Sequence, residues 1–129
     1  MTMTVDALVA AARGRIRELS PAGYRAWTGH EHVLIDVREP AEYAAGHLPG
    51  AVNLPRGVLE FQIHAHPAMA CVADSALSLR DRPLVLYCLS GGRSALAADS
   101  LGLLGFGKVY SLAGGLAAWR NAGLDVTME

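Results

Sequence analysis

A cysteine that follows an apolar run and precedes two glycines and an arginine is the first group in this sequence that could do chemistry. Cys88 opens the stretch CLSGGRS, residues 88–94, directly after RPLVLY. The two glycines can turn the backbone tightly and direct several N–H groups inward, which forms a cradle for an anion. The dipole of a following helix and the Arg93 guanidinium both favour the thiolate. The stretch therefore predicts a nucleophile whose surroundings accept an anionic group.

Two classes of reaction use a thiolate beside an anion cradle. One is attack on phosphorus, which gives a phosphocysteine, and the other is attack on a sulfane sulfur, which gives a persulfide. Cysteine-based phosphatases have a loop that is longer by one residue, whereas four residues separate Cys88 from Arg93 here. The shorter loop favours a single sulfur atom over a tetrahedral phosphate. A pure packing role for Cys88 is the third interpretation, and the conjunction of strand, cysteine, glycines, arginine and helix argues against it.

The elements that must position this loop alternate between strands and helices. Apolar runs predict strands at 16–19, 32–37, 51–55, 82–88 and 108–115. Helical spacing and end signals predict helices at 5–16, 20–29, 39–46, 56–63, 94–105 and 115–123, with a loop containing helical pieces at 64–80. Alternating strands and helices form parallel sheets, so we expect an α/β fold. Cys88 would lie at the carboxyl end of a strand, where such sheets bind ligands.

The composition suits one globular domain and argues against several classes of partner. The 129 residues are 52% hydrophobic and 18% charged with a net charge of −1, so no general attraction for nucleic acid or an anionic membrane is expected. Two cysteines without a Cys-x-x-Cys pair favour a reducing compartment. No apolar run is long enough to span a bilayer, and the N-terminus does not look like a secretory signal. We therefore expect a single cytoplasmic domain over residues 1–129.

Three stretches make the sequence similar to the family of rhodanese-like sulfurtransferases. LIDVREPAEYAAGHLPGAVNLP (34–55) resembles the first signature of the family, YCLSGGRSALAA (87–98) its active-site loop, and VYSLAGGLAAWRNAGLDV (109–126) its terminal signature. The resemblance covers about residues 15–127 and implies a five-stranded parallel sheet with helices on both faces. Residues 1–14 would be a helical extension outside this core.

The resemblance also implies roles within the loop. Cys88 would take a sulfane sulfur from a donor such as thiosulfate, hold it as a persulfide and pass it to cyanide, a thiol or a sulfur-carrier protein. Loop N–H groups would form the cradle, Arg93 would bind the sulfonate of the donor or stabilise the persulfide, and Ser94 would cap the helix or bond back into the loop. The expected site residues are Cys88, Leu89, Ser90, Gly91, Gly92, Arg93 and Ser94. Some thiosulfate-using enzymes carry a further basic residue beside the cysteine, where this chain has Leu89 and Ser90.

Several points are left open by the resemblance. The alternatives are a non-catalytic rhodanese-like binding module and, with less support, a cysteine-based phosphatase or arsenate reductase. The oligomeric state is left between monomer and homodimer. No cofactor, metal, nucleic acid or membrane is expected to take part.

Charged residues in the first signature are expected to be structural. Glu39 and Glu42 suit the dipole of a first helical turn. Asp36 and Arg38 can tie loops through charge-assisted hydrogen bonds. His47 is expected to bond the backbone rather than act as a general base.

Residues 56–80 contain further candidates and are expected near the mouth of the site. His64, His66 and Cys71 lack a recognised metal-ligand spacing, so no metal is expected there. Cys71 is expected to be a buried apolar residue, with a resolving thiol for Cys88 as the alternative. Arg56 is expected on the surface, and the alternative is a contribution to the positive potential at the mouth.

Overall fold

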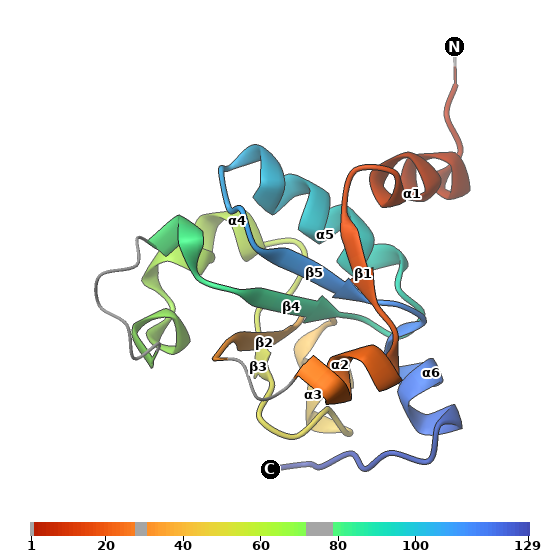
Figure 1. Ribbon diagram of the computed structural model, residues 1–129, viewed down its shortest axis with the longest axis vertical. Helices are drawn as coiled ribbons and strands as arrows, with labels where there is room; N and C mark the ends of the chain where they lie inside the picture. The colour runs from red at the N-terminus through yellow and green to blue at the C-terminus, as the bar shows by residue number, and fades with distance from the viewer. Residues whose placement is uncertain (1, 28–30, 72–78) are drawn as a thin grey trace.

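A five-stranded parallel sheet forms the centre of the protein (Figure 1). The computed structural model describes residues 2–27, 31–71 and 79–129. The strands are β1 (Arg17–Leu19), β2 (Val33–Asp36), β3 (Val52–Asn53), β4 (Leu84–Tyr87) and β5 (Val109–Leu112). They lie in the order β1-β5-β4-β2-β3, and every neighbouring pair is parallel. The predicted α/β fold is confirmed, and β4 lies in the middle of the sheet.

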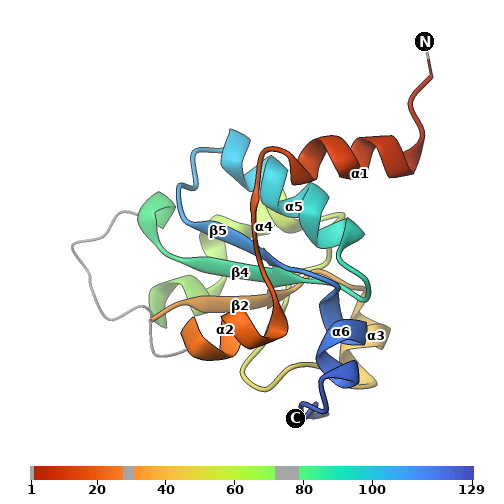
Figure 2. The ribbon, with the colours of Figure 1, turned by 45° about the vertical axis from the view of Figure 1, so that its right-hand side comes forward.

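Helices cover both faces of the sheet (Figures 1 and 2). One layer holds α1 (Val5–Arg13), α4 (Leu59–Gln62) and α5 (Gly92–Leu103), and the other holds α2 (Pro21–Trp27), α3 (Pro40–Ala44) and α6 (Gly115–Asn121). The short 3₁₀ turns between α4 and β4 are η1 (Ile63–Ala65), η2 (Pro67–Cys71) and η3 (Leu79–Asp81). No helix in the described part of the chain is both long and apolar enough to cross a bilayer.

The strand β4 supplies side chains alternately to two hydrophobic cores, as the two-residue repeat of a strand requires. Leu84, Leu86 and Cys88 belong to the core under α4 and α5. Val85 and Tyr87 belong to the core on the other face, together with residues of α2 and α6. All five residues are buried. The alternation therefore places the Cys88 side chain on the face of the sheet that α5 covers.

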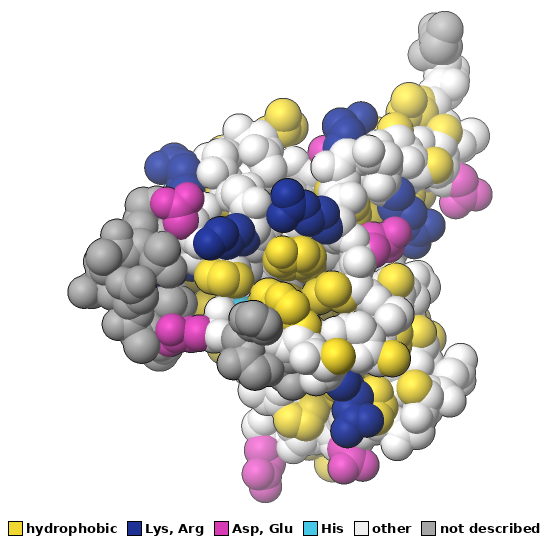
Figure 3. Space-filling view, in the orientation of Figure 1, with side chains coloured by type: hydrophobic (Ala, Val, Ile, Leu, Met, Phe, Trp, Pro, Cys, Tyr) yellow, Lys and Arg dark blue, Asp and Glu magenta, His cyan; other side chains and the backbone are white. Residues whose placement is uncertain are grey.

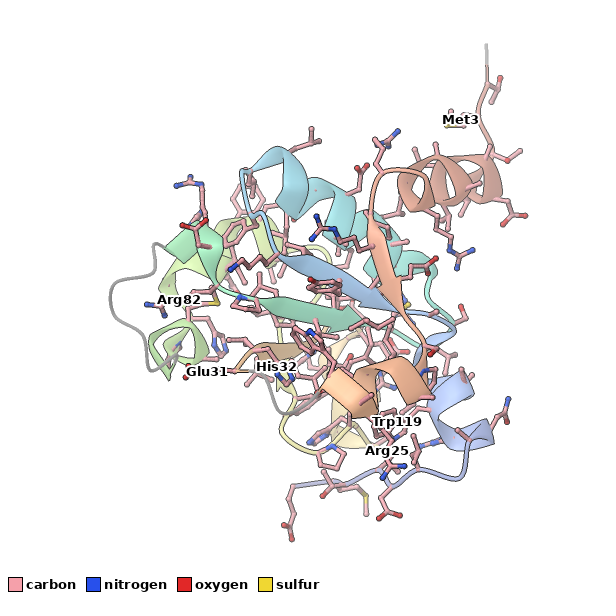
Figure 4. The ribbon with its side chains drawn as sticks, in the orientation of Figure 1. Met3, Arg25, Glu31, His32, Arg82 and Trp119 are labelled. Atoms are coloured by element: carbon pink, nitrogen blue, oxygen red, sulfur yellow. The ribbon has the colours of Figure 1, made fainter. Side chains whose placement is uncertain are left out.

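Aromatic side chains fix α2 and α6 against the opposite face. Trp119 of α6 lies between these two helices (Figure 4), and its ring meets the Tyr24 ring edge-on with centroids 6.0 Å apart. Trp27 packs against Tyr110 of β5 with ring centroids 5.4 Å apart. The start of α6 is thereby held close to the carboxyl ends of the central strands.

Several helix boundaries differ from the predicted ones, and three of these differences are larger or bear on the site. α5 begins at Gly92, two residues before the predicted start, because Gly91 takes a left-handed conformation (φ 103°) that allows the helix to begin at once. α1 ends at Arg13 rather than at residue 16. The helix predicted over 56–63 is α-helical only from Leu59 to Gln62 and continues as a 3₁₀ turn.

Candidate functional site

The sulfur of Cys88 lies beneath the loop that follows β4 and accepts hydrogen bonds from it. Sγ is 3.0 Å from the amide nitrogen of Gly91 and 3.5 Å from that of Ser94. The hydroxyl of Ser94 lies 3.6 Å from Sγ. The whole cysteine is 1% exposed. Two backbone N–H groups and a hydroxyl thus surround the sulfur, an arrangement that favours negative charge on it.

Gly91 gives the loop this shape. Its φ of 103° is a conformation that residues with a side chain rarely adopt. A Cβ at this position would also lie 3.2 Å from Nη2 of Arg13 and 3.3 Å from the amide nitrogen of Gly114. Glycine therefore allows the N–H group to reach the sulfur while two other segments pass close by.

The glycine pair Gly114–Gly115 lets the start of α6 pack directly against the loop. Both residues have positive φ angles, 74° and 57°. The N–H of Leu116 donates to the Cys88 carbonyl and the N–H of Ala117 to the Leu89 carbonyl, each at 2.9 Å. A Cβ on Gly115 would collide with the carbonyl oxygen of Cys88. The start of α6 can approach the loop this closely only because position 115 has no side chain, a feature that the glycine pair in the terminal signature could have signalled.

Ser94 and Ser111 form a buried pair of hydroxyls beside the sulfur. Their Oγ atoms are 2.8 Å apart, and both residues are 0% exposed. Ser94 Oγ also lies 3.3 Å from the carbonyl oxygen of Gly91, so this side chain bonds back into the loop. Ser111 was not among the predicted site residues, because a lone serine in an apolar strand carries no sequence signal.

The guanidinium of Arg93 is paired with Glu42 of α3. Nη1 and Nη2 lie 2.7 and 3.1 Å from the two carboxylate oxygens. These hydrogen bonds lower the pKa of Glu42 to about 2, and they raise the pKa of Arg93. Glu42 therefore suits its helical turn as predicted and also holds Arg93 at the rim of the site.

The other predicted loop residues lie at the surface or at the helix start. Leu89 is 47% exposed and Ser90 is exposed, whereas Gly92 is partly buried against α1. Within the described residues, the hydrogen bonds to the sulfur come from Gly91 and Ser94. The roles predicted for Leu89, Ser90 and Gly92 toward a bound anion stay predictions.

A groove of about 540 Å³ opens along the outside of the loop, between α1 and the start of α5. Figures 1 and 2 both show α1 lying beside the N-terminal half of α5. The lining residues are Val5, Asp6, Val9 and Arg13 from α1, and Ser90, Gly92, Arg93 and Leu96 from the loop and α5. The N-terminal helix, predicted as an extension outside the core, forms one wall of this groove.

The residues expected to be structural in the first signature do tie loops together. Asp36 and Arg38 are both buried and pair at 2.7 Å, and Arg38 also donates to the carbonyl of Gly46 at 2.7 Å. His47 bonds through its ring nitrogens to backbone oxygens, at 2.9 Å to that of Tyr43 and 2.8 Å to that of Glu129. The hydrogen bonds predicted for Asp36, Arg38 and His47 are confirmed.

The segment after β3 contributes to α5 rather than to the loop. Arg56 donates to the Glu60 carboxylate at 2.8 Å and to the Ser100 hydroxyl at 3.2 Å. The arginine predicted at the surface has a side chain that is 30% exposed, and its guanidinium is held between α4 and α5. No three His, Cys, Asp or Glu side chains in the described ranges gather as a metal site would require. The side chain of Cys71 lies outside the described part, so its predicted roles are untested.

Comparisons with known proteins identify a family through a family model and a curated relative. A family model described as a rhodanese-like domain matches residues 20–122. A sulfurtransferase from Allochromatium vinosum is 36% identical over 94 residues, which are 73% of this chain and 77% of that protein. A protein of unknown function from Rhodopseudomonas palustris, described as a possible tyrosine phosphatase, has a TM-score of 0.79 at 30% identity and covers 98% of this chain and 96% of its own. A thiosulfate sulfurtransferase from Pseudomonas aeruginosa has a TM-score of 0.71 at 34% identity, over 88% of this chain and 20% of that one.

Proposed function

The chain belongs to the family of rhodanese-like domains, and from this premise we propose that it is a sulfurtransferase that carries sulfane sulfur on Cys88. The observation that carries the proposal is the pair of N–H groups, from Gly91 and Ser94, that face Sγ at 3.0 and 3.5 Å. Such donors suit the anionic sulfur of a thiolate before the transfer and of a persulfide after it.

Thiosulfate is the donor that we propose for the first half-reaction. The Cys88 thiolate attacks the outer sulfur of thiosulfate and forms a new S–S bond. The S–S bond inside thiosulfate breaks, and sulfite leaves with the electron pair. No external oxidant is needed, because the transferred sulfur already has the oxidation state of a sulfane sulfur. The positive end of the 12-residue helix α5 favours the persulfide anion that results.

The second half-reaction returns the thiolate. Cyanide or the thiolate of an acceptor attacks the terminal sulfur, the S–S bond to Cys88 breaks, and the electron pair stays on the Cys88 sulfur. The persulfide extends the reactive atom by about 2 Å beyond Sγ. This extension suits a cysteine that is itself 1% exposed. A small thiol or a sulfur-carrier protein is the proposed acceptor class.

Phosphoryl transfer by the same cysteine is the competing function, and the description of the Rhodopseudomonas protein favours it. A phosphocysteine would need cationic donors on the equatorial oxygens of the transferred group. Arg93 is instead paired with Glu42 at 2.7 Å, and the loop has four residues between Cys88 and Arg93. Both features favour sulfur over phosphorus as the electrophile.

We also propose the cytoplasm as the location and residues 1–129 as a single domain. The location rests on the thiol chemistry, because a persulfide carrier needs a compartment that keeps Cys88 reduced between turnovers.

Mass spectrometry of the loaded protein tests the function. After incubation with thiosulfate, the wild type should carry one added sulfur on Cys88, and cyanide should remove it. Cys71→Ser is the matched control and should load equally, whereas Cys88→Ser should not load. Absence of the adduct with both thiosulfate and mercaptopyruvate, together with turnover of an aryl phosphate, would assign the site to phosphoryl transfer.

A further inference from the structure

Arg13 of α1 stands over the active-site loop, and we propose that it binds the anionic group of the sulfur donor. The inference deepens the proposed sulfur transfer and rests on it. It assigns a specificity-determining residue to a helix that precedes residues 20–122, the part matched by the family model.

The Arg13 guanidinium lies close to Gly91 of the active-site loop. Nη2 lies 3.2 Å from the point where a Cβ on Gly91 would stand. The N–H of the same glycine donates to Sγ of Cys88 at 3.0 Å. A single residue of backbone thus separates the guanidinium from the nucleophile, and Arg13 lines the groove that runs past the loop.

The guanidinium of Arg13 keeps donors available for a ligand. Its ion pair joins Nε to the Glu18 carboxylate at 3.7 Å, which is longer than a hydrogen bond. No hydrogen bond between described residues uses its Nη atoms, and the side chain is 42% exposed. A guanidinium fork of this kind matches the oxygens of a sulfonate group.

The second arginine on the groove is already engaged. Arg93 makes two hydrogen bonds to Glu42, which largely cancel its charge. Asp6, the acid on the same wall as Arg13, stands seven residues earlier, about 10 Å away along the helix. An incoming dianion therefore meets two guanidinium groups on the groove. Arg93 is engaged by Glu42, whereas the Nη atoms of Arg13 face the groove with only a longer ion pair to Glu18 on Nε.

The helix that carries Arg13 is docked rather than loosely attached. Ala12 is fully buried, and a Cβ on Gly92 would lie 3.8 Å from Cγ2 of Val9. Just after the helix, Arg15 pairs with Asp99 of α5 at 2.7 Å. Figure 3 shows acidic side chains next to basic ones around α1 and β1, so the positive charge is local and not a general property of this face.

The proposal is tested by steady-state kinetics that measure kcat/KM separately for the sulfur donor and for the acceptor. Arg13→Gln should lower kcat/KM for thiosulfate about tenfold, mainly through KM, and leave kcat/KM for a neutral thiol acceptor unchanged. Arg13→Lys should recover part of the loss. Arg17→Gln is the matched control, because it removes the same charge from the adjoining strand, where Arg17 lies over the Tyr110 ring. Equal effects of Arg13→Gln and Arg17→Gln on kcat/KM for thiosulfate would overturn the proposal.

A second measurement decides the role of Arg13 even if thiosulfate is not the donor. Sulfite, the leaving group of the first half-reaction, should slow the alkylation of Cys88 by iodoacetamide in the wild type and in Arg17→Gln, but not in Arg13→Gln. Equal protection of all three proteins would overturn the proposal. A wild type that sulfite protects but thiosulfate does not load would instead refute the proposed donor and leave Arg13 as an anion-binding residue.

Discussion

Two buried hydroxyl groups lie beside the sulfur of Cys88. The Ser94 hydroxyl faces Sγ at 3.6 Å and is held by the Ser111 hydroxyl at 2.8 Å. A buried hydroxyl needs a hydrogen-bond partner, and in this pair each serine supplies one for the other. Ser111 of the neighbouring strand β5 therefore supplies the hydrogen-bond partner that the buried Ser94 hydroxyl needs.

Replacing the two serines one at a time separates stability from reactivity. Ser94→Ala leaves the Ser111 hydroxyl unpaired and should lower the free energy of unfolding by about 1–3 kcal/mol. It should also slow persulfide formation several-fold, because the hydroxyl beside the sulfur is lost. Ser111→Ala should cost similar stability but leave the loading rate nearly unchanged, since the Ser94 hydroxyl stays beside Sγ. Urea unfolding and quenched mass spectrometry measure both quantities, and equal slowing by both variants would contradict this division.

Among the elements, the short helix α6 does most to shape the loop. It has seven residues and begins with the N–H groups that bind the carbonyls of Cys88 and Leu89. Trp119 and Leu116 anchor it in the core, where they are 7% and 1% exposed. The loop is thus held from one side by its own helix α5 and from the other by the start of α6.

A methyl group at position 115 should disrupt this contact. Gly115→Ala places an alanine at a φ of 57° with its Cβ against the Cys88 carbonyl, so we expect a loss of about 2 kcal/mol or more in the free energy of unfolding and a strong loss of sulfur transfer. Gly102→Ala is the matched control, because Gly102 lies in α5 with nothing within 4 Å of the added carbon. The control should gain about 0.5–1 kcal/mol. Urea unfolding and turnover compare them, and equal stability of the two variants would refute the steric argument.

For the molecule as a whole, the pair between Glu42 and Arg93 joins the two helical layers. Glu42 belongs to α3 on one face of the sheet and Arg93 to α5 on the other. Both side chains are about a third exposed, at 34% and 38%. The pair therefore closes the carboxyl edge of the sheet but is partly screened by water.

The pH dependence of stability reports on this pair. The folded-state pKa of Glu42, about 2, lies below its ordinary value of 4.5, so the stabilisation is complete above pH 4.5 and disappears as the pH falls towards 2. Glu42→Gln should be less stable than the wild type by up to about 1 kcal/mol at pH 7, with the difference shrinking below pH 4.5. Arg93→Gln should remove the same pH dependence. Urea unfolding at several pH values measures this, and a difference that persists at pH 2 would refute it.

The features that the sequence could predict are those that depend on residues close to one another in the chain. The α/β order and the position of Cys88 depend on periodicity within single segments, so they were predicted. Arg13, Ser111 and Gly115 reach the site from distant parts of the chain, and only the tertiary fold brings them together. The pairing of Arg93 with Glu42 was missed for the same reason, because the two residues are 51 positions apart.

The order of the strands has a consequence for synthesis of the chain on the ribosome. β1, made early, pairs with β5, made late, and the helix that binds the Cys88 carbonyl follows β5. Cys88 is therefore synthesised before the segments that cover it. Because long-range parallel pairing comes late in folding, the nascent thiol passes through a period without its shelter. The thiol is therefore open to oxidants until the segments that follow residue 109 have folded against it.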